Sequence, residues 1–164
     1  MLNMPIEEIR SNISLKEDYW EYDFDTNCYA FALGLDIGEY DICKNAYQPG
    51  VIYINATNKP ISLLKNLSIY ERIQLDLKTL KIGYSEIGKN ECLYKHIGNY
   101  ECIFWTILLF LNDNDFHFAR YNYDGKLYEK IGYFGFPKET SIDDIENRGY
   151  KLVKKYTLRR WERY

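Results

Sequence analysis

The sequence predicts an α+β fold in which N-terminal helices pack on a small antiparallel β-sheet. Two observations lead to this prediction. Helical patterns dominate the first half of the chain, whereas strand patterns separated by turn signals follow from Asn99 onward. The chain has 164 residues, of which 46% are hydrophobic, so it can bury one substantial core. We therefore expect one domain over residues 1–164.

A buried helix is expected to begin near Cys28. Thr26 or Asp25 can supply the N-cap oxygen that accepts hydrogen bonds from the first-turn amides. The residues that follow are almost all apolar, which indicates burial on nearly every side. Gly34 or Gly38 can end this helix.

Two further helical segments flank this one. Residues 5–10 indicate one or two turns, and residues 61–82 carry the clearest apolar stripe at helical spacing. Ser68 with Glu71 three positions later forms a capping-box pattern, so this region is either one helix or two helices that meet at Ser68. We expect it to end at Gly83.

Strand patterns fill most of the second half. The turn signal QPG at 48–50 precedes an expected short strand at residues 51–54, and residues 84–87 suit another. The Asp124-Gly125 turn predicts a hairpin, and residues 141–147 predict a short helix. The main strands are expected at residues 100–111, 116–121, 126–131 and 150–158.

Charge and hydropathy restrict the partners and the location. The net charge of −3 argues against a nucleic-acid partner. The start of the chain lacks a signal-peptide pattern, and the longest apolar run, residues 103–111, is too short for a membrane helix. We therefore expect a cytoplasmic protein with no membrane partner, although signal-independent export stays open. Residues 148–164 are strongly basic and form either a solvated strand face or a contact surface for a protein partner.

The cysteines give no sign of a metal centre. Cys28, Cys43, Cys92 and Cys102 match no CxxC spacing, and without a secretory signal we expect reduced thiols. Cys92 and Cys102 with His96, in a loop-like stretch, lack a fourth zinc ligand. We expect no metal and no cofactor, and structural roles for the three cysteines after Cys28.

Cys28 and His117 together suggest a thiol enzyme. A helix N-terminus stabilises a thiolate through its unpaired amides, and His117, on an expected strand, can take the thiol proton. His117 is one of only two histidines in the chain. Considered separately, the cysteine and the histidine each suit a buried structural role; the dyad hypothesis depends on both.

Glu129 is the expected orienting partner of His117. If Tyr121 pairs with Gly125 across a tight hairpin, His117 lies directly opposite Glu129, whose carboxylate can accept from the second ring nitrogen. A register that differs by two residues keeps both side chains on one face, whereas a slip of one residue does not. The alternative for Glu129 is a surface ion pair with Lys126 or Lys130.

Two sequence islands resemble the papain-like hydrolases, particularly the bacterial NlpC/P60-type branch and an uncharacterised group close to it. The run NCYAFALG (27–34) resembles the nucleophile helix, and DFHFAR (115–120) resembles the histidine strand. QPG at 48–50 resembles the loop before their first strand. Glu129 falls at the third catalytic position, where the family usually has histidine or another polar residue, and Ala119 replaces an expected aromatic.

The resemblance implies a papain-like fold and an acyl-enzyme mechanism. Cys28, His117 and Glu129 would form the triad, and the Cys28 amide with a side-chain donor, Tyr22 or Asn27, would form the oxyanion hole. The implied substrate is a peptide, an isopeptide or a glutamine amide. The same core serves deamidases and acyltransferases, and an inactive binding module, such as an effector or inhibitor that grips a protein partner, is the alternative.

Overall fold

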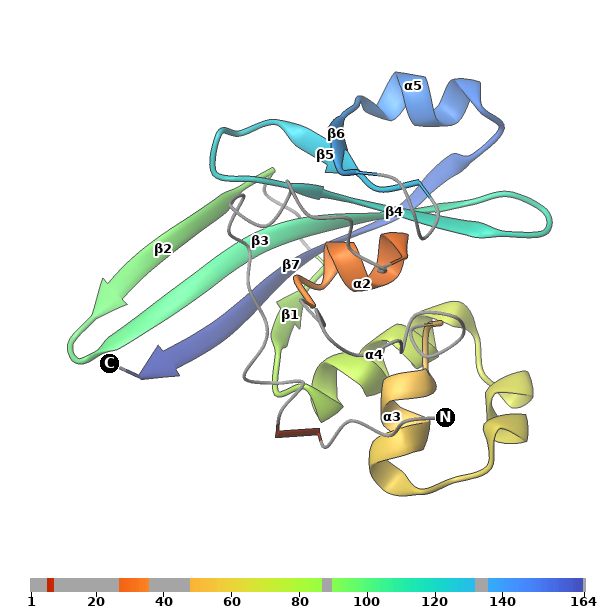
Figure 1. Ribbon diagram of the computed structural model, residues 1–164, viewed down its shortest axis with the longest axis horizontal. Helices are drawn as coiled ribbons and strands as arrows, with labels where there is room; N and C mark the ends of the chain where they lie inside the picture. The colour runs from red at the N-terminus through yellow and green to blue at the C-terminus, as the bar shows by residue number, and fades with distance from the viewer. Residues whose placement is uncertain (1–5, 8–26, 36–47, 87–89, 132–135, 164) are drawn as a thin grey trace.

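The structure is a computed structural model, and it describes residues 6–7, 27–35, 48–86, 90–131 and 136–163 (Figure 1). These residues confirm the predicted α+β class, with helices from the N-terminal half and an open seven-stranded antiparallel sheet. The main path runs β1-β7-β3-β4-β5-β6, and β2 pairs with β3. The strands are β1 (Gly83–Ser85), β2 (Cys92–Ile97), β3 (Tyr100–Leu111), β4 (Phe116–Tyr121), β5 (Leu127–Glu129), β6 (Lys138–Glu139) and β7 (Lys151–Arg163).

Strand β3 is central, as its sequence predicts. It pairs with β7 along its whole length, with β2 at one end and with β4 at the other. Its side chains alternate between two cores. Trp105 and Leu109 face the helix α2 (Cys28–Ala32), whereas Leu108 and Phe110 face the helix α5 (Ile142–Asn147). Figure 1 shows α2 and α5 on opposite sides of the sheet at β4.

The prediction of a strand at residues 51–54 was wrong, because these residues belong to the helix α3 (Val51–Thr57). The side chain of Asp76, from the helix α4 (Ile69–Thr79), accepts hydrogen bonds from the Gly50 amide at 2.7 Å and the Tyr53 amide at 2.9 Å. A carboxylate at this point satisfies the first amides of a helix. The β-branched residues of α3 locally favour a strand, but the contact with Asp76 stabilises a helix here.

The region around Ser68 follows the two-helix alternative. A 3₁₀ helix (Ile61–Asn66) comes first, and the Ser68 side chain then caps α4 by accepting from the Glu71 amide at 3.2 Å. The helix ends at Thr79 instead of reaching Gly83, which begins β1.

Several expected boundaries also need correction. The N-cap of α2 is Asn27, not Thr26 or Asp25, both of which lie outside the described residues. The expected end of α2 at Gly34 is confirmed, since Gly34 follows the C-cap Leu33 and has a left-handed φ of 71°. The stretch around His96 is strand β2 rather than a loop, and β7 extends beyond the predicted end. Of residues 5–10, the described pair 6–7 is helical.

Replacing Gly50 with alanine is expected to destabilise the fold by about 2–4 kcal/mol. Gly50 has a φ of 96°, and an added Cβ would lie 2.5 Å from Leu64 Cδ2 and 3.2 Å from Arg72 Cβ. Gly125→Ala is the matched control, because Gly125 also has a positive φ, of 76°, but an added Cβ meets nothing within 4 Å. Chemical denaturation of both variants separates crowding from backbone strain; equal losses would contradict the role of crowding.

In the part of the chain that the structure describes, none of the helices has the length and apolar character needed to cross a membrane.

Candidate active site

Cys28 is the first residue of α2, where the sequence placed it. The Asn27 side chain caps this helix by accepting from the Ala30 amide at 2.8 Å. The carbonyl end of the short helix is held to the sheet, since Trp105 donates to the Ala32 carbonyl at 3.0 Å and Arg120 donates to the Phe31 carbonyl at 2.8 Å. These contacts fix the position of the cysteine. The Asn27 side-chain oxygen is used in capping, and an additional oxyanion role for its amide stays a prediction.

The environment of the Cys28 thiol is enclosed. Cys28 is 9% exposed, and burial raises the pKa of its thiol to about 12. The nearby charge of Asp115 also raises this pKa, whereas hydrogen bonds from backbone groups, foremost that of Phe118 on β4, lower it. Burial therefore outweighs the help that the helix N-terminus was expected to provide, and the resting group is a neutral thiol.

His117 lies on β4 and is engaged with Glu129. Its Nε2 atom is 2.6 Å from Glu129 Oε2, and both side chains are buried. The imidazole also packs against the ring of Phe110, with centroids 6.5 Å apart, and against Tyr150 at 5.6 Å. Because Nε2 binds the carboxylate, Nδ1 is the nitrogen that would take a proton from a thiol.

The predicted hairpin register was wrong by two residues. Glu129 lies opposite Ala119, and Tyr121 pairs with Leu127 rather than with Gly125, which belongs to a wider turn. The contact with His117 forms nevertheless, because positions two residues apart on a strand share a face and long side chains reach diagonal neighbours.

Glu129 is held by a second partner that the sequence did not reveal. The guanidinium of Arg148 donates from Nη1 to Glu129 Oε1 at 2.7 Å and from Nη2 to Glu129 Oε2. Burial by itself raises the pKa of Glu129, but the hydrogen bonds and charges of His117 and Arg148 outweigh it and lower the pKa to about 2. The alternative of a surface pair with Lys126 is contradicted, since Glu129 is fully buried and Lys126 approaches Glu139 at 3.8 Å.

In the sequence, Arg148 is one of several basic residues in the segment 148–164. Its position just after a predicted helix is the one local signal that could have separated it from the rest. Its partner lies 19 residues earlier in the chain, and no periodicity links the two positions.

Cys28 and His117 are both associated with β4, since a backbone hydrogen bond of Phe118 reaches Cys28 and His117 belongs to the strand. Their side chains belong to the two different faces of the sheet, since Cys28 packs in the core beneath α2, whereas His117 contacts Phe110 and Tyr150 on the α5 side. Among the described residues, β5 pairs with β4 from Ala119 to Tyr121 only. The stretch of β4 at residues 116–118 therefore has no described strand on its outer side.

Tyr150 and Asp115 connect the two groups at this edge. The Tyr150 ring contacts the imidazole, and its hydroxyl donates to Asp115 Oδ2 at 3.3 Å. The charges of Asp115 and Cys28 influence each other, and burial together with the charges of Asp115 and Cys28 raises the pKa of Tyr150. Tyr150 thus contacts the imidazole and interacts electrostatically with the thiol.

The other candidate residues have different outcomes. Tyr22, the predicted oxyanion donor, lies outside the described residues, as does Cys43. Cys92 and Cys102 are buried, in agreement with their expected structural roles. Within the described ranges, no three side chains of metal-binding type are arranged to hold an ion.

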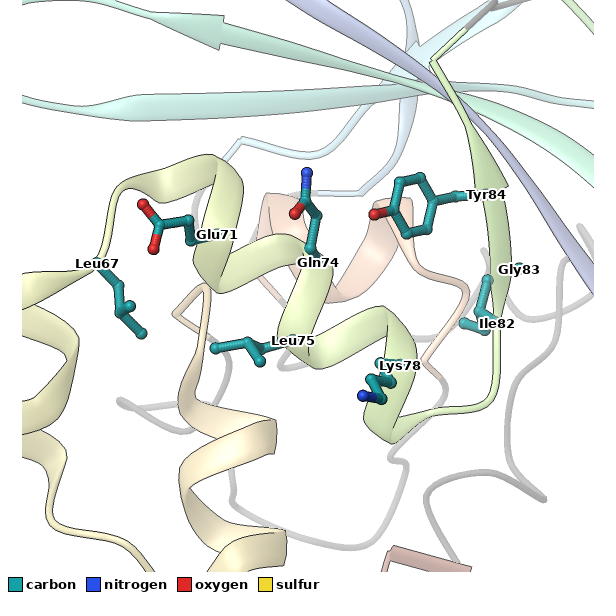
Figure 2. A pocket seen from close by; sticks show the side chains of 8 residues that line it. All are labelled: Leu67, Glu71, Gln74, Leu75, Lys78, Ile82, Gly83 and Tyr84. Carbon is teal, nitrogen blue, oxygen red and sulfur yellow. The ribbon is translucent and has the colours of Figure 1, made fainter.

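A separate groove of about 590 Å³ lies between α4 and β1 (Figure 2). Its lining is mainly apolar and includes Leu67, Leu75 and Ile82, with Tyr84 on the β1 side. Neither Cys28, His117 nor Glu129 lines this groove, so it is not part of the candidate active site.

Comparison with known proteins identifies no relative, since the chain matches no family model, no curated protein and no solved structure. The papain-like hypothesis therefore depends on the residues and the geometry described above.

Proposed function

We propose that this protein is a papain-like thiol hydrolase that acts on peptide or amide bonds through Cys28, His117 and Glu129. The main support for this proposal is the buried 2.6 Å contact between His117 Nε2 and Glu129 Oε2. His117 lies on β4, and a backbone hydrogen bond from Phe118 of the same strand reaches Cys28. Nucleophilic acyl transfer needs a carboxylate that orients an imidazole and a cysteine within reach of the other ring nitrogen. The contact between Glu129 and His117 supports the first requirement, and the proposal assigns the second to Cys28.

In the proposed reaction, Cys28 Sγ attacks the carbonyl carbon of the substrate while its proton passes to His117 Nδ1. Because burial raises the pKa of the thiol to about 12, proton transfer accompanies the attack rather than preceding it. Glu129 stabilises the imidazolium, which then protonates the departing amine. Water, deprotonated by His117, attacks the thioester and releases the acid and the free thiol.

The oxyanion would be bound by the Cys28 backbone amide and by Tyr22 or Asn27. Replacing water with an amine as the acceptor turns the same chemistry into acyl transfer, and a glutamine side-chain substrate turns it into deamidation. The substrate would be a peptide or protein.

A catalytically inactive papain-like binding module is the second candidate. The observation that favours it is the burial of Cys28, which keeps its sulfur protonated. In such a module, the pair formed by Glu129 and Arg148 would stabilise the fold, and the basic strand β7 would contact a protein partner.

Alkylation of the cysteines tests the two candidates. A hydrolase is expected to react with iodoacetamide at neutral pH fastest at Cys28, because His117 accepts its proton, and His117→Ala should slow this labelling about tenfold or more. Mass-spectrometric mapping over time gives the rate for each cysteine. His96→Ala is the matched control, since His96 is exposed on β2.

The hydrolase proposal fails if Cys28 is labelled no faster than Cys92 and Cys102. It also fails if His96→Ala slows the labelling of Cys28 as much as His117→Ala does.

A further inference from the structure

We infer that Arg148 is a positioning residue of this site, which locks the Glu129 carboxylate in the orientation that His117 needs. The inference deepens the proposed function and rests on it. Arg148 donates to both oxygens of Glu129, at 2.7 Å from Nη1 to Oε1 and from Nη2 to Oε2. A bidentate contact fixes the plane of a carboxylate as well as its position, which a single hydrogen bond does not.

The place of Arg148 in the fold makes this contact rigid. Arg148 is the C-cap of α5, a helix whose Ile145 is fully buried against the core on that side of the sheet. Gly149, with a φ of 96°, then turns the chain toward Tyr150. Residues 148–150 therefore make two contacts with the His117–Glu129 pair. The Arg148 guanidinium binds Glu129, and the Tyr150 ring packs against His117.

The electrostatics also assign a role to Arg148. His117 Nε2 and Arg148 Nη2 share one oxygen, Glu129 Oε2. Among the described residues, the other charged or titratable groups near the carboxylate include Lys138, opposite Glu129 on β6, Tyr150 just before β7 with Asp115, and Asp144 near Arg148. Without Arg148, the buried carboxylate would take up a proton more readily, and once protonated it would no longer hold the imidazole as an ionised acceptor.

Arg148 can be changed without opening the core. Its side chain is 37% exposed, whereas that of Glu129 is fully buried. Arg148→Gln removes the charge, Arg148→Lys keeps the charge but loses the bidentate geometry, and Arg159→Gln is the matched control on an exposed arginine of β7.

Two measurements test the inference. Nuclear magnetic resonance of ¹⁵N-histidine-labelled protein reports the imidazole N–H proton that is bonded to Glu129, and the chain has only two histidines to assign. This signal is expected to weaken or to exchange with water several-fold faster in Arg148→Gln, to be intermediate in Arg148→Lys and to be unchanged in Arg159→Gln. The acid limb of the Cys28 alkylation profile is expected to move up by about one pH unit in Arg148→Gln.

The inference is overturned if Arg148→Gln matches the wild type and Arg159→Gln in both measurements. If Arg148→Gln does not fold, Arg148→Lys decides in the same way. If Cys28 of the wild type is not labelled selectively, the proposed function fails by itself, and the imidazole signal then decides for Arg148: its loss in Arg148→Gln supports the positioning contact, and its persistence overturns it.

Discussion

Replacing Asp76 with alanine is expected to lower the free energy of unfolding by about 3–5 kcal/mol, because three donors would lose their buried acceptor at once. The Asp76 carboxyl is fully buried and accepts from Tyr29 Oη at 2.7 Å, from the Gly50 amide at 2.7 Å and from the Tyr53 amide at 2.9 Å. These donors belong to α2 and to the start of α3, so one side chain on α4 holds three helices together.

Urea denaturation followed by circular dichroism measures this loss. Asp113→Ala, in the exposed turn after β3, is the matched control and should change stability little. Asp76→Asn keeps one acceptor oxygen and should fall between alanine and the wild type. A loss below about 1 kcal/mol in Asp76→Ala would show that the three donors find other partners.

Asp76 also has a specific pH signature. Burial raises its pKa from 3.8 to about 7. Between these two values the folded protein binds more protons than the unfolded chain, so the Asp76 contribution to stability is present at low pH and is lost as the pH rises through about 7. The variant Asp76→Asn, which cannot titrate, should not show this part of the pH dependence.

Glu129→Gln is expected to lower the free energy of unfolding by about 2–3 kcal/mol at neutral pH. The substitution preserves the shape of the side chain but removes the charge that His117 and Arg148 share. The folded-state pKa of Glu129 is lowered from 4.5 to about 2, so its stabilisation is complete above 4.5 and is lost as the pH falls through about 2.

The stability difference between Glu129→Gln and the wild type should therefore shrink as the pH falls across this window. Thermal denaturation at a series of pH values measures it. Glu139→Gln, on the neighbouring strand β6, is the control, because its ion pair with Lys126 is on the surface and such pairs contribute little. A difference that stays constant with pH would contradict the assignment of the lowered pKa to Glu129.

Some elements of the fold could be predicted from the sequence and others could not. The strands β3 and β4, the cap at Ser68 and the short helix after Ser141 follow from the spacing and type of adjacent residues, which the chain carries locally. The helix α3 does not. Its first amides depend on Asp76, 26 positions after Gly50, and local preference for a strand was outweighed by that contact.

The candidate site likewise contains one residue that the sequence could identify and one that it could not. Glu129 could be named from the sequence because its face on the hairpin depends only on alternation, which a two-residue error in register leaves unchanged. Arg148 could not be named, because its contact with Glu129 is created when α5 packs over the sheet.

The sequence by itself determined that Cys28 begins a buried helix and that His117 and Glu129 share one face of a hairpin, since cap, periodicity and alternation are properties of neighbouring residues. Only the tertiary structure decided the chemical state of these groups. Packing against β4 buries the thiol and raises its pKa to about 12, whereas Arg148 and His117 keep the buried Glu129 ionised. The physical reason is that ionisation depends on the groups and solvent that surround a side chain in space, and distant segments supply both.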